Sequence, residues 1–290
     1  MDFNRFATTR KKIMAISIIC SVIIIAGGTL ALTFLEWWLG TILSVAAIVL
    51  LALFSIFCLS PMMRTYKRIV IEETLKSYLS EIEFDTSRFN KEFIKSHPLF
   101  ELKKQFKSDY YFLGTYKEIN FEIGNVQSYD ELKDHHVYIS SYSFNGKIFS
   151  LPVETDEKAE ILIIEKKDRL ASEANRLKNT AFQYLIKSKN EPFNELFELF
   201  STVENIEITS FISLCIELIR KIKKICVHRL FLLLKDNRLY LAIDEQNSSF
   251  QLKLKNPVTT DDVNELRKEY SPFFHFMDAL LEQIKKSSSS

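Results

Sequence analysis

Two long apolar runs open the chain, and shorter patterns of two kinds follow them. Residues 13–34 and 41–59 contain no charged side chain. Because a helix rises about 1.5 Å per residue, runs of this length are close to what a hydrocarbon core roughly 30 Å thick requires. The short link between the runs forces the two helices to be antiparallel. The pattern therefore predicts a transmembrane helical hairpin within residues 1–60.

Charged and aromatic residues at the ends of the hairpin predict its orientation. Lysine and arginine precede the first run and follow the second, but the link contains neither. Since positively charged flanks stay in the cytoplasm, both chain ends are expected there, with a bacterial inner membrane as the expected location. Tryptophan suits the headgroup level of a bilayer. The residues expected at the membrane interface are Glu36, Trp37 and Trp38 in the link, and Arg64, Lys67 and Arg68 after the second helix.

A cleaved signal peptide is the alternative interpretation of the first run, because the small residues at 26–28 resemble a cleavage site. The run is too long for that, and the basic residues after the second run would still hold the rest of the chain in the cytoplasm. The same small residues offer a face for close helix packing, either within the hairpin or between two copies of the chain. Neither run contains an ionisable residue, so no transport pathway is expected.

After the hairpin the hydrophobic period is first that of a helix and then that of strands. Helical spacing over 64–82 predicts a juxtamembrane helix, and a polar linker extends to residue 108. Strands are expected at 109–116, 119–123, 136–144, 147–153 and 160–165, with a polar loop over 127–134. Asn145 and Gly146 form the dipeptide most typical of a tight hairpin turn, since both central positions of a type I′ turn need positive φ.

The remaining residues mix helices and strands. We expect a charged loop over 166–178, an apolar-aromatic element over 193–200, a helix over 208–224, a hairpin around Asp236 and Asn237, and a strand over 250–254. A terminal helix capped by Thr259 or Thr260 is expected to break at Pro272, before a disordered serine tail at 287–290.

These elements define the predicted organisation. The chain divides into the hairpin 1–60, a juxtamembrane helix and linker over 61–108, and a cytosolic domain over 109–286. The expected fold class is α+β, with a two-helix transmembrane hairpin followed by an antiparallel sheet and packing helices.

Composition excludes some function classes. The chain has 38 basic and 37 acidic residues, and the part beyond the hairpin is close to neutral. A nucleic-acid-binding domain needs a basic excess, so nucleic acid is not an expected partner. The four cysteines show no CxxC spacing. They fit buried side chains in a reducing compartment better than a disulfide framework or a zinc site.

Candidate chemistry is sparse. His135 and His136 are adjacent, and neighbours on a strand point to opposite faces, so they are not expected to bind one metal ion. Cys226 and His228 could share a strand face, but no third group that would orient them can be named, and packing is the preferred interpretation. No nucleotide-binding, zinc-protease or hydrolase motif occurs. No catalytic residue, metal or cofactor is therefore predicted.

Two charged clusters are better explained by the ends of helices than by a catalytic or phosphate-binding site. Asp261 and Asp262 stand where the positive end of the terminal helix is expected. Arg220, Lys221, Lys223 and Lys224 crowd the last turns of the helix over 208–224, where cations suit the negative end. Phosphate binding by these four residues is the alternative.

The order of elements resembles that of the bacterial family catalogued as domain of unknown function 3137. The stretches that carry the resemblance are 111–116, 144–149, 193–197 with the following helix, and 239–243. The charged segment 166–178 departs from the strand and loop expected at that place in the family. The resemblance implies a pair of membrane spans and a cytosolic α+β region, and it brings no activity with it.

Three hypotheses about function remain open. The first is a non-enzymatic membrane-anchored domain that binds a protein partner or the membrane surface, with the lipid bilayer itself and a second copy of the chain among its partners. The second is an enzyme that acts on a membrane-associated substrate through a site that includes His135, His136, Cys226 or His228. The third is a secreted bacterial effector that inserts into host membranes.

Overall fold

The computed structural model describes most of the chain, in two compact units. The described residues are 3–34, 37–54, 60–76, 78–79, 81–85, 89–134, 137–155, 157–166, 174–245 and 258–288. The first unit consists of Met1–Ser77 and Phe250–Arg267, and the second of Tyr78–Ser249 and Lys268–Ser290. The predicted strand over 250–254 lies outside the described residues.

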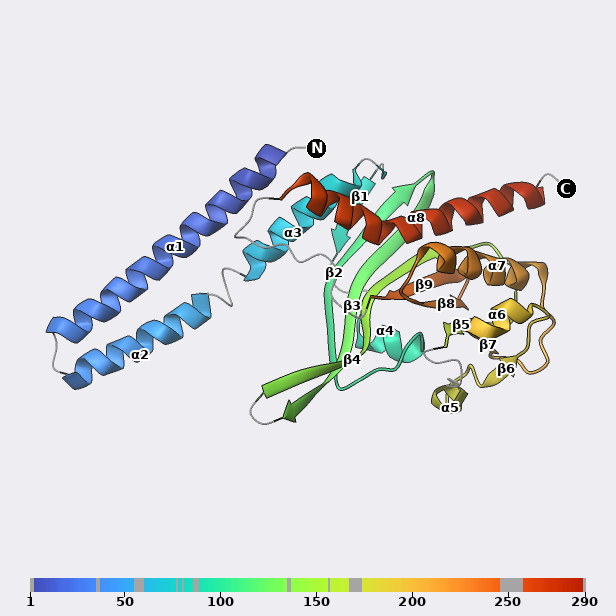
Figure 1. Ribbon diagram of the computed structural model, residues 1–290, viewed down its shortest axis with the longest axis horizontal. Helices are drawn as coiled ribbons and strands as arrows, with labels where there is room; N and C mark the ends of the chain where they lie inside the picture. Colours follow the sequence, from blue (N-terminus) through green and yellow to red (C-terminus); the bar gives the residue numbers. More distant parts are fainter. Residues whose placement is uncertain are drawn as a thin grey trace. The chain divides into compact units, whose positions relative to one another are not determined.

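The first unit is helical. Helix α1 (Phe3–Phe34) packs along α2 (Trp37–Phe54) and also contacts α3 (Ser60–Leu75) (Figure 1). Pro61 stands in the first turn of α3, where its missing N–H would have no helical partner in any case. Within the described residues, no helix combines the length and the apolarity that a membrane crossing requires. The helical pair is thus observed, and its transmembrane character stays a prediction.

Helix α3 is shorter than the sequence pattern indicates. Tyr66, Val70, Ile71 and Leu75 form its buried stripe, and the Thr74 hydroxyl donates to the Val70 carbonyl at 2.7 Å. The predicted continuation to residue 82 is wrong, because Ile82 lies in an edge strand and pairs with Gly114. An apolar residue at the right helical spacing also fits a strand that buries one face.

The second unit is built on one antiparallel sheet of nine described strands, which confirms the α+β class (Figure 1). The strands are β1 (Glu81–Asp85), β2 (Gln105–Tyr116), β3 (Ile119–Asp134), β4 (Val137–Pro152), β5 (Ile161–Glu165), β6 (Tyr184–Ile186), β7 (Phe197–Ser201), β8 (Arg229–Lys235) and β9 (Arg238–Asp244). Their order is β1-β2-β3-β4-β9-β8-β5-β7-β6. The sheet therefore begins as a meander and is completed by later strands that insert beside β4.

The turn predicted at Asn145 and Gly146 is wrong. Both residues lie inside β4, which pairs with β3 on one side and β9 on the other. A Cβ atom on Gly146 would come within 1.8 Å of the Ile243 carbonyl oxygen. Glycine is needed here for the close approach of β9, and Gly146 does not adopt a positive φ.

The chain reverses elsewhere. Lys117 and Glu118, with φ of 47° and 70°, connect β2 to β3, and the polar residues 127–134 that we expected in a loop continue β3. Their polarity suits a strand with one exposed face. The predicted hairpin at Asp236 and Asn237 is confirmed, with φ of 52° and 54° between β8 and β9.

Helices cover both faces of the sheet. On one face, α4 (Lys91–Ser96) and α5 (Ala174–Leu177) lie over a core that includes Phe144, Leu162 and Phe231. On the other face, α7 (Ser210–Ile225) packs together with the part of α8 (Thr260–Ser288) from Lys268 onward (Figure 1). Phe149 of β4 stacks there on Phe273 of α8, at 5.4 Å between ring centroids. A short helix, α6 (Glu191–Leu196), precedes β7.

The predicted break at Pro272 is wrong, because α8 runs through it. Proline at this position deprives the Lys268 carbonyl of its usual donor. Lys268 is exposed, so water can replace that hydrogen bond. The buried residues that follow, among them Phe273 and Phe276, hold the helix on the sheet.

Candidate functional site

Large apolar side chains point outward along α1 and α2. They make up 14 of the 21 large apolar side chains that are exposed in the described part of the chain. We call this set the hairpin surface, and each member is between 41% and 66% exposed. Its members are Ile16, Ile18, Ile19, Val22, Ile23, Ile25, Leu30, Trp38, Ile42, Val45, Ile48, Val49, Leu50 and Leu53. An apolar surface of this extent is typical of a binding or membrane-contact face.

Two threonine hydroxyl groups of α1 are satisfied by the helix itself. Thr29 Oγ1 donates to the Ile25 carbonyl at 3.0 Å, and Thr33 Oγ1 donates to the Thr29 carbonyl at 3.1 Å. In an apolar environment every polar group needs such an internal partner, because water is absent. These threonines are therefore compatible with contact between α1 and lipid.

The predicted interface residues lie on different elements of the first unit. Glu36 is outside the described residues, and so is the side chain of Trp37, the first residue of α2. Trp38 is 47% exposed beside it. Arg64, Lys67 and Arg68 follow on α3, where Arg64 and Arg68 are exposed and Lys67 is half-buried. This arrangement keeps the tryptophans at one end of α2 and the cations beyond the other.

Of the four catalytic candidates, the structure describes Cys226 and His228, and these two differ in exposure. Cys226 is buried and His228 is exposed, and burial raises the pKa of the Cys226 thiol. A thiol that is harder to ionise is a poor nucleophile. His135 and His136 lie outside the described residues.

Thr259 caps α8, which confirms one of the two predicted caps, and Asp262 completes the cap. Asp262 Oδ2 accepts from the Thr259 backbone N–H and from Thr259 Oγ1, both at 2.7 Å, while the Asp262 N–H donates to Thr259 Oγ1 at 3.2 Å. This reciprocal pair satisfies the exposed N–H groups at the helix start. Asp261 also lies in the first turn.

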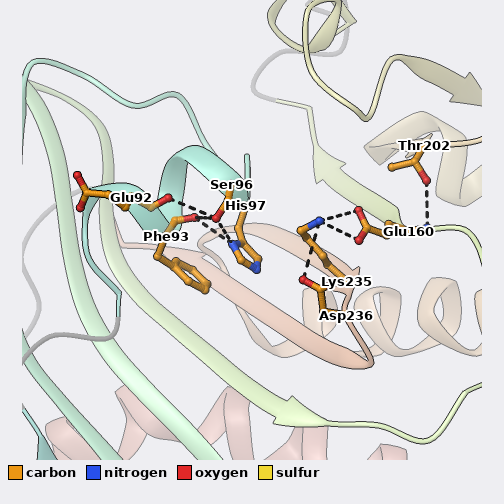
Figure 2. Close-up of polar contacts among 8 residues, drawn as sticks. All are labelled: Glu92, Phe93, Ser96, His97, Glu160, Thr202, Lys235 and Asp236. Atoms are coloured by element: carbon orange, nitrogen blue, oxygen red, sulfur yellow. Dashed lines mark hydrogen bonds and ion pairs between the residues drawn. The ribbon is translucent and has the colours of Figure 1, made fainter.

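A cluster around His97 was not expected from the sequence (Figure 2). The His97 ring stacks on Phe93 at 4.0 Å, and its Nδ1 lies 2.9 Å from Ser96 Oγ and 3.0 Å from the Phe93 carbonyl oxygen. Burial lowers the pKa of His97, the Phe93 carbonyl partly opposes that shift, and the charge of Lys235 adds to it. Lys235 itself is held by both carboxylate oxygens of Glu160, at 2.8 and 2.9 Å.

The His97 cluster has the chemistry of a helix cap. Ser96 Oγ donates to the carbonyls of Glu92 and Phe93 at the end of α4, and the His97 N–H donates to the Phe93 carbonyl (Figure 2). The serine hydroxyl is thus engaged with the backbone rather than directed at a reacting group. The arrangement stabilises the end of α4 beside the β8–β9 hairpin.

A second unexpected cluster lies inside the sheet unit. Lys147 of β4 is fully buried, and its Nζ lies 2.5 Å from Glu245 Oε1 and 3.1 Å from Glu269 Oε2 of α8. The same ammonium group lies 5.5 Å from the centroid of the Tyr270 ring. The sequence signal that could have indicated this cluster is Lys147 itself, which is a charged residue within a predicted strand and shares a strand face with the polar Asn145.

A polar pocket of about 370 Å³ lies near one edge of the sheet. Arg238 on its wall donates to Ser150 Oγ at 2.8 Å and lies 3.1 Å from Glu122 Oε2. Glu81 and Glu83 of β1 add two exposed carboxylates to the lining. Within the described residues, no three acidic, histidine or cysteine side chains gather so as to hold a metal ion.

Comparison with known proteins identifies a family for the chain. Residues 142–286 match the family model described as "Protein of unknown function (DUF3137)". The match covers β4 from Tyr142 onward, the later strands of the sheet, and α7 and α8. No curated protein and no solved structure matches the chain.

Proposed function

The chain belongs to the DUF3137 family of proteins of unknown function, and we propose that this member is a membrane-anchored interaction module. In this proposal α1 and α2 insert into a bilayer as a hairpin, with both chain ends in the cytoplasm of a bacterial cell. The sheet unit then acts beside the membrane and binds a protein partner or the lipid surface.

The hairpin surface is the observation that supports an anchor. Its side chains stay exposed although α1 and α2 already pack on each other, so the pair has apolar surface on its outer sides as well. Transfer of each fully exposed Ile, Leu or Val from water to an apolar phase is favourable by roughly 1.5–3 kcal/mol. Fourteen partly exposed side chains therefore favour lipid over water strongly.

The charge pattern supports insertion with this orientation. Arg10, Lys11 and Lys12 precede the uncharged part of α1, and Arg64 and Arg68 follow α2. Lysine and arginine beside a membrane span favour the cytoplasmic side. A helical pair that packed against another protein would not need basic residues at its two outer ends and none in the link.

Fractionation tests the anchor. We expect the full chain to stay in the membrane pellet after extraction with carbonate at high pH and to be released by detergent. The double variant Ile23→Lys/Ile48→Lys places two charges on the hairpin surface and should move the protein to the soluble fraction or to aggregates. The matched control Val203→Lys changes an exposed apolar residue of the sheet unit and should stay in the pellet. Release of the unaltered chain by carbonate would refute the anchor.

Cysteine labelling tests the orientation. In intact cells, a membrane-impermeant maleimide should label Glu36→Cys in the link but not Thr8→Cys near the chain start, which should react only after permeabilisation. The opposite pattern, or equal labelling of both positions, would contradict the proposed topology.

A further inference from the structure

The connection between α7 and β8 exposes two apolar side chains. Val227 is 88% exposed, the highest value among the exposed large apolar side chains of the described residues, and Ile225 is 53% exposed. Cys226 between them is buried. We call Ile225, Cys226, Val227 and His228 the α7–β8 turn. Alternation of buried and exposed positions directs both apolar side chains to solvent.

Hydrogen bonds hold the turn in this form. The Cys226 N–H donates to the Ile222 carbonyl at 2.9 Å, which ends α7. Lys223 Nζ donates to the His228 carbonyl at 3.0 Å and lies 2.7 Å from Glu165 Oε1. The exposure of Ile225 and Val227 is therefore a feature of a well-anchored turn.

Basic side chains lie on both sides of the exposed apolar pair. Lys221 and Lys224 are exposed on the last turns of α7, and His228 is exposed beyond Val227. No acidic residue occurs between positions 220 and 229. The position of Lys223 is explained by the helix dipole and by its ion pair with Glu165. Neither interaction explains why Ile225 and Val227 are exposed in the α7–β8 turn.

We infer that the α7–β8 turn docks on an anionic lipid surface. Ile225 and Val227 enter the headgroup region, while Lys221 and Lys224 contact lipid phosphates. Shallow apolar insertion flanked by lysine is the chemistry of interfacial membrane binding. Two apolar side chains are too few for the roughly 1,000 Å² that a stable protein interface buries, which favours lipid over a protein partner.

The inference rests on the proposed function only in that the anchor keeps the sheet unit close to a bilayer. Tethering raises the effective concentration of the turn at the surface, so a weak contact is sufficient. Anionic lipid attracts each nearby lysine by about 1 kcal/mol. Removal of two lysines should then lower the ratio of docked to undocked turns roughly 30-fold.

Quenching by brominated lipid tests the inference on the full chain in vesicles. The variant Trp37→Phe/Trp38→Phe/Val227→Trp carries its one tryptophan in the turn, because the chain has only those two. We expect quenching in vesicles of phosphatidylcholine with phosphatidylglycerol and none in phosphatidylcholine alone. Addition of Lys221→Gln and Lys224→Gln should abolish it.

A second exposed valine provides the matched control. Val203→Trp in the same background labels a turn that contains Glu204 rather than lysines, and Val203 is 48% exposed. It should remain unquenched in both vesicles. Equal quenching at 203 and 227, or no quenching at 227 in anionic vesicles, would overturn the inference.

Two readouts keep the possible failures apart. If the anchor proposal fails, the chain does not co-float with vesicles of either composition, whereas failure of the turn alone leaves the chain in the vesicles without quenching. Hydrogen exchange of residues 221–229 in the unaltered protein avoids any folding defect of the tryptophan variant. We expect slower exchange in anionic than in neutral vesicles, and equal rates would overturn the inference.

Discussion

Replacement of Lys147 by methionine should destabilise the sheet unit far more than the same replacement of Lys235. Methionine has a similar length without the ammonium group, so the variant keeps the packing on β4 and leaves Glu245 and Glu269 without this cation. Removal of one partner from a buried ion pair costs about 3–5 kcal/mol. Domains are stable by only about 5–15 kcal/mol, so the loss is a large part of the total.

The two buried cysteines of the sheet unit provide the assay. Tryptophan fluorescence would report on the hairpin, because both tryptophans lie there. In a Cys20→Ser/Cys58→Ser background, maleimide reaction at Cys215 and Cys226 measures unfolding of the sheet unit directly, since both are buried. With a urea dependence of ~2 kcal/mol per molar, the unfolding midpoint of Lys147→Met should fall by roughly 2 M.

Lys235→Met is the matched control. Lys235 also binds a glutamate at 2.8 Å, but the side chains of Lys235 and Glu160 are 19% and 25% exposed. Ion pairs that water reaches contribute about 1 kcal/mol or less, so the midpoint should move little. Lys147→Met combined with Glu245→Gln and Glu269→Gln should recover more than half of the loss. If Lys147→Met cost no more than Lys235→Met, the interpretation of Lys147 as a buried, strongly coupled cation would be wrong.

Measurements of unfolding and of folded yield check three further expectations. Gly146→Ala should lower the free energy of unfolding by about 3 kcal/mol, because its Cβ would meet the Ile243 carbonyl oxygen, whereas Gly27→Ala, with nothing within 4 Å, should leave the yield of folded protein unchanged. Burial raises the pKa of the Cys215 thiol, so the free energy of unfolding should fall as pH rises above about 9, where the unfolded thiol ionises. Cys215→Ala should weaken that dependence without removing it, because burial raises the pKa of the Cys226 thiol as well. Burial lowers the pKa of His97, so stability should be complete above its ordinary value of 6.5 and decline as pH falls below it, and His97→Gln should flatten the acid side of the profile.

Much of the fold was accessible from local patterns. Continuous apolar runs located β5 and β8, helical spacing located α7, and Asp236 with Asn237 marked a true hairpin. Asn145 with Gly146 carried an equally strong turn signal and was misleading. At Asp236 and Asn237 the turn requires a positive φ, whereas Gly146 is required because β9 approaches β4 closely. Glycine can meet either need, so sequence alone could not show which of the two applies at Gly146.

The short elements at the sheet edges escaped prediction for a different reason. Strand β6 has three residues and β1 has five, and both are fixed by partners distant in sequence rather than by their own pattern. The sequence pattern placed residues 81 and 82 in the predicted helix over 64–82 and the rest of β1 in the polar linker. Charge such as that of Glu81 and Glu83 is nevertheless common on edge strands, where it protects against further pairing.

The candidate sites show the same division between local and long-range information. An apolar run and its basic flanks are contiguous in sequence, so the proposed anchor could be predicted residue by residue. The Lys147 cluster brings β4 together with the end of β9 and with α8, both of which follow β4 by about a hundred residues along the chain. The α7–β8 turn lies between these extremes. Its lysines were visible in sequence and were assigned to the helix dipole, but only the structure shows that Cys226 turns inward while Ile225 and Val227 turn outward. The outward orientation of Ile225 and Val227 is the reason to propose a lipid contact at the end of α7, and the quenching experiment tests that contact.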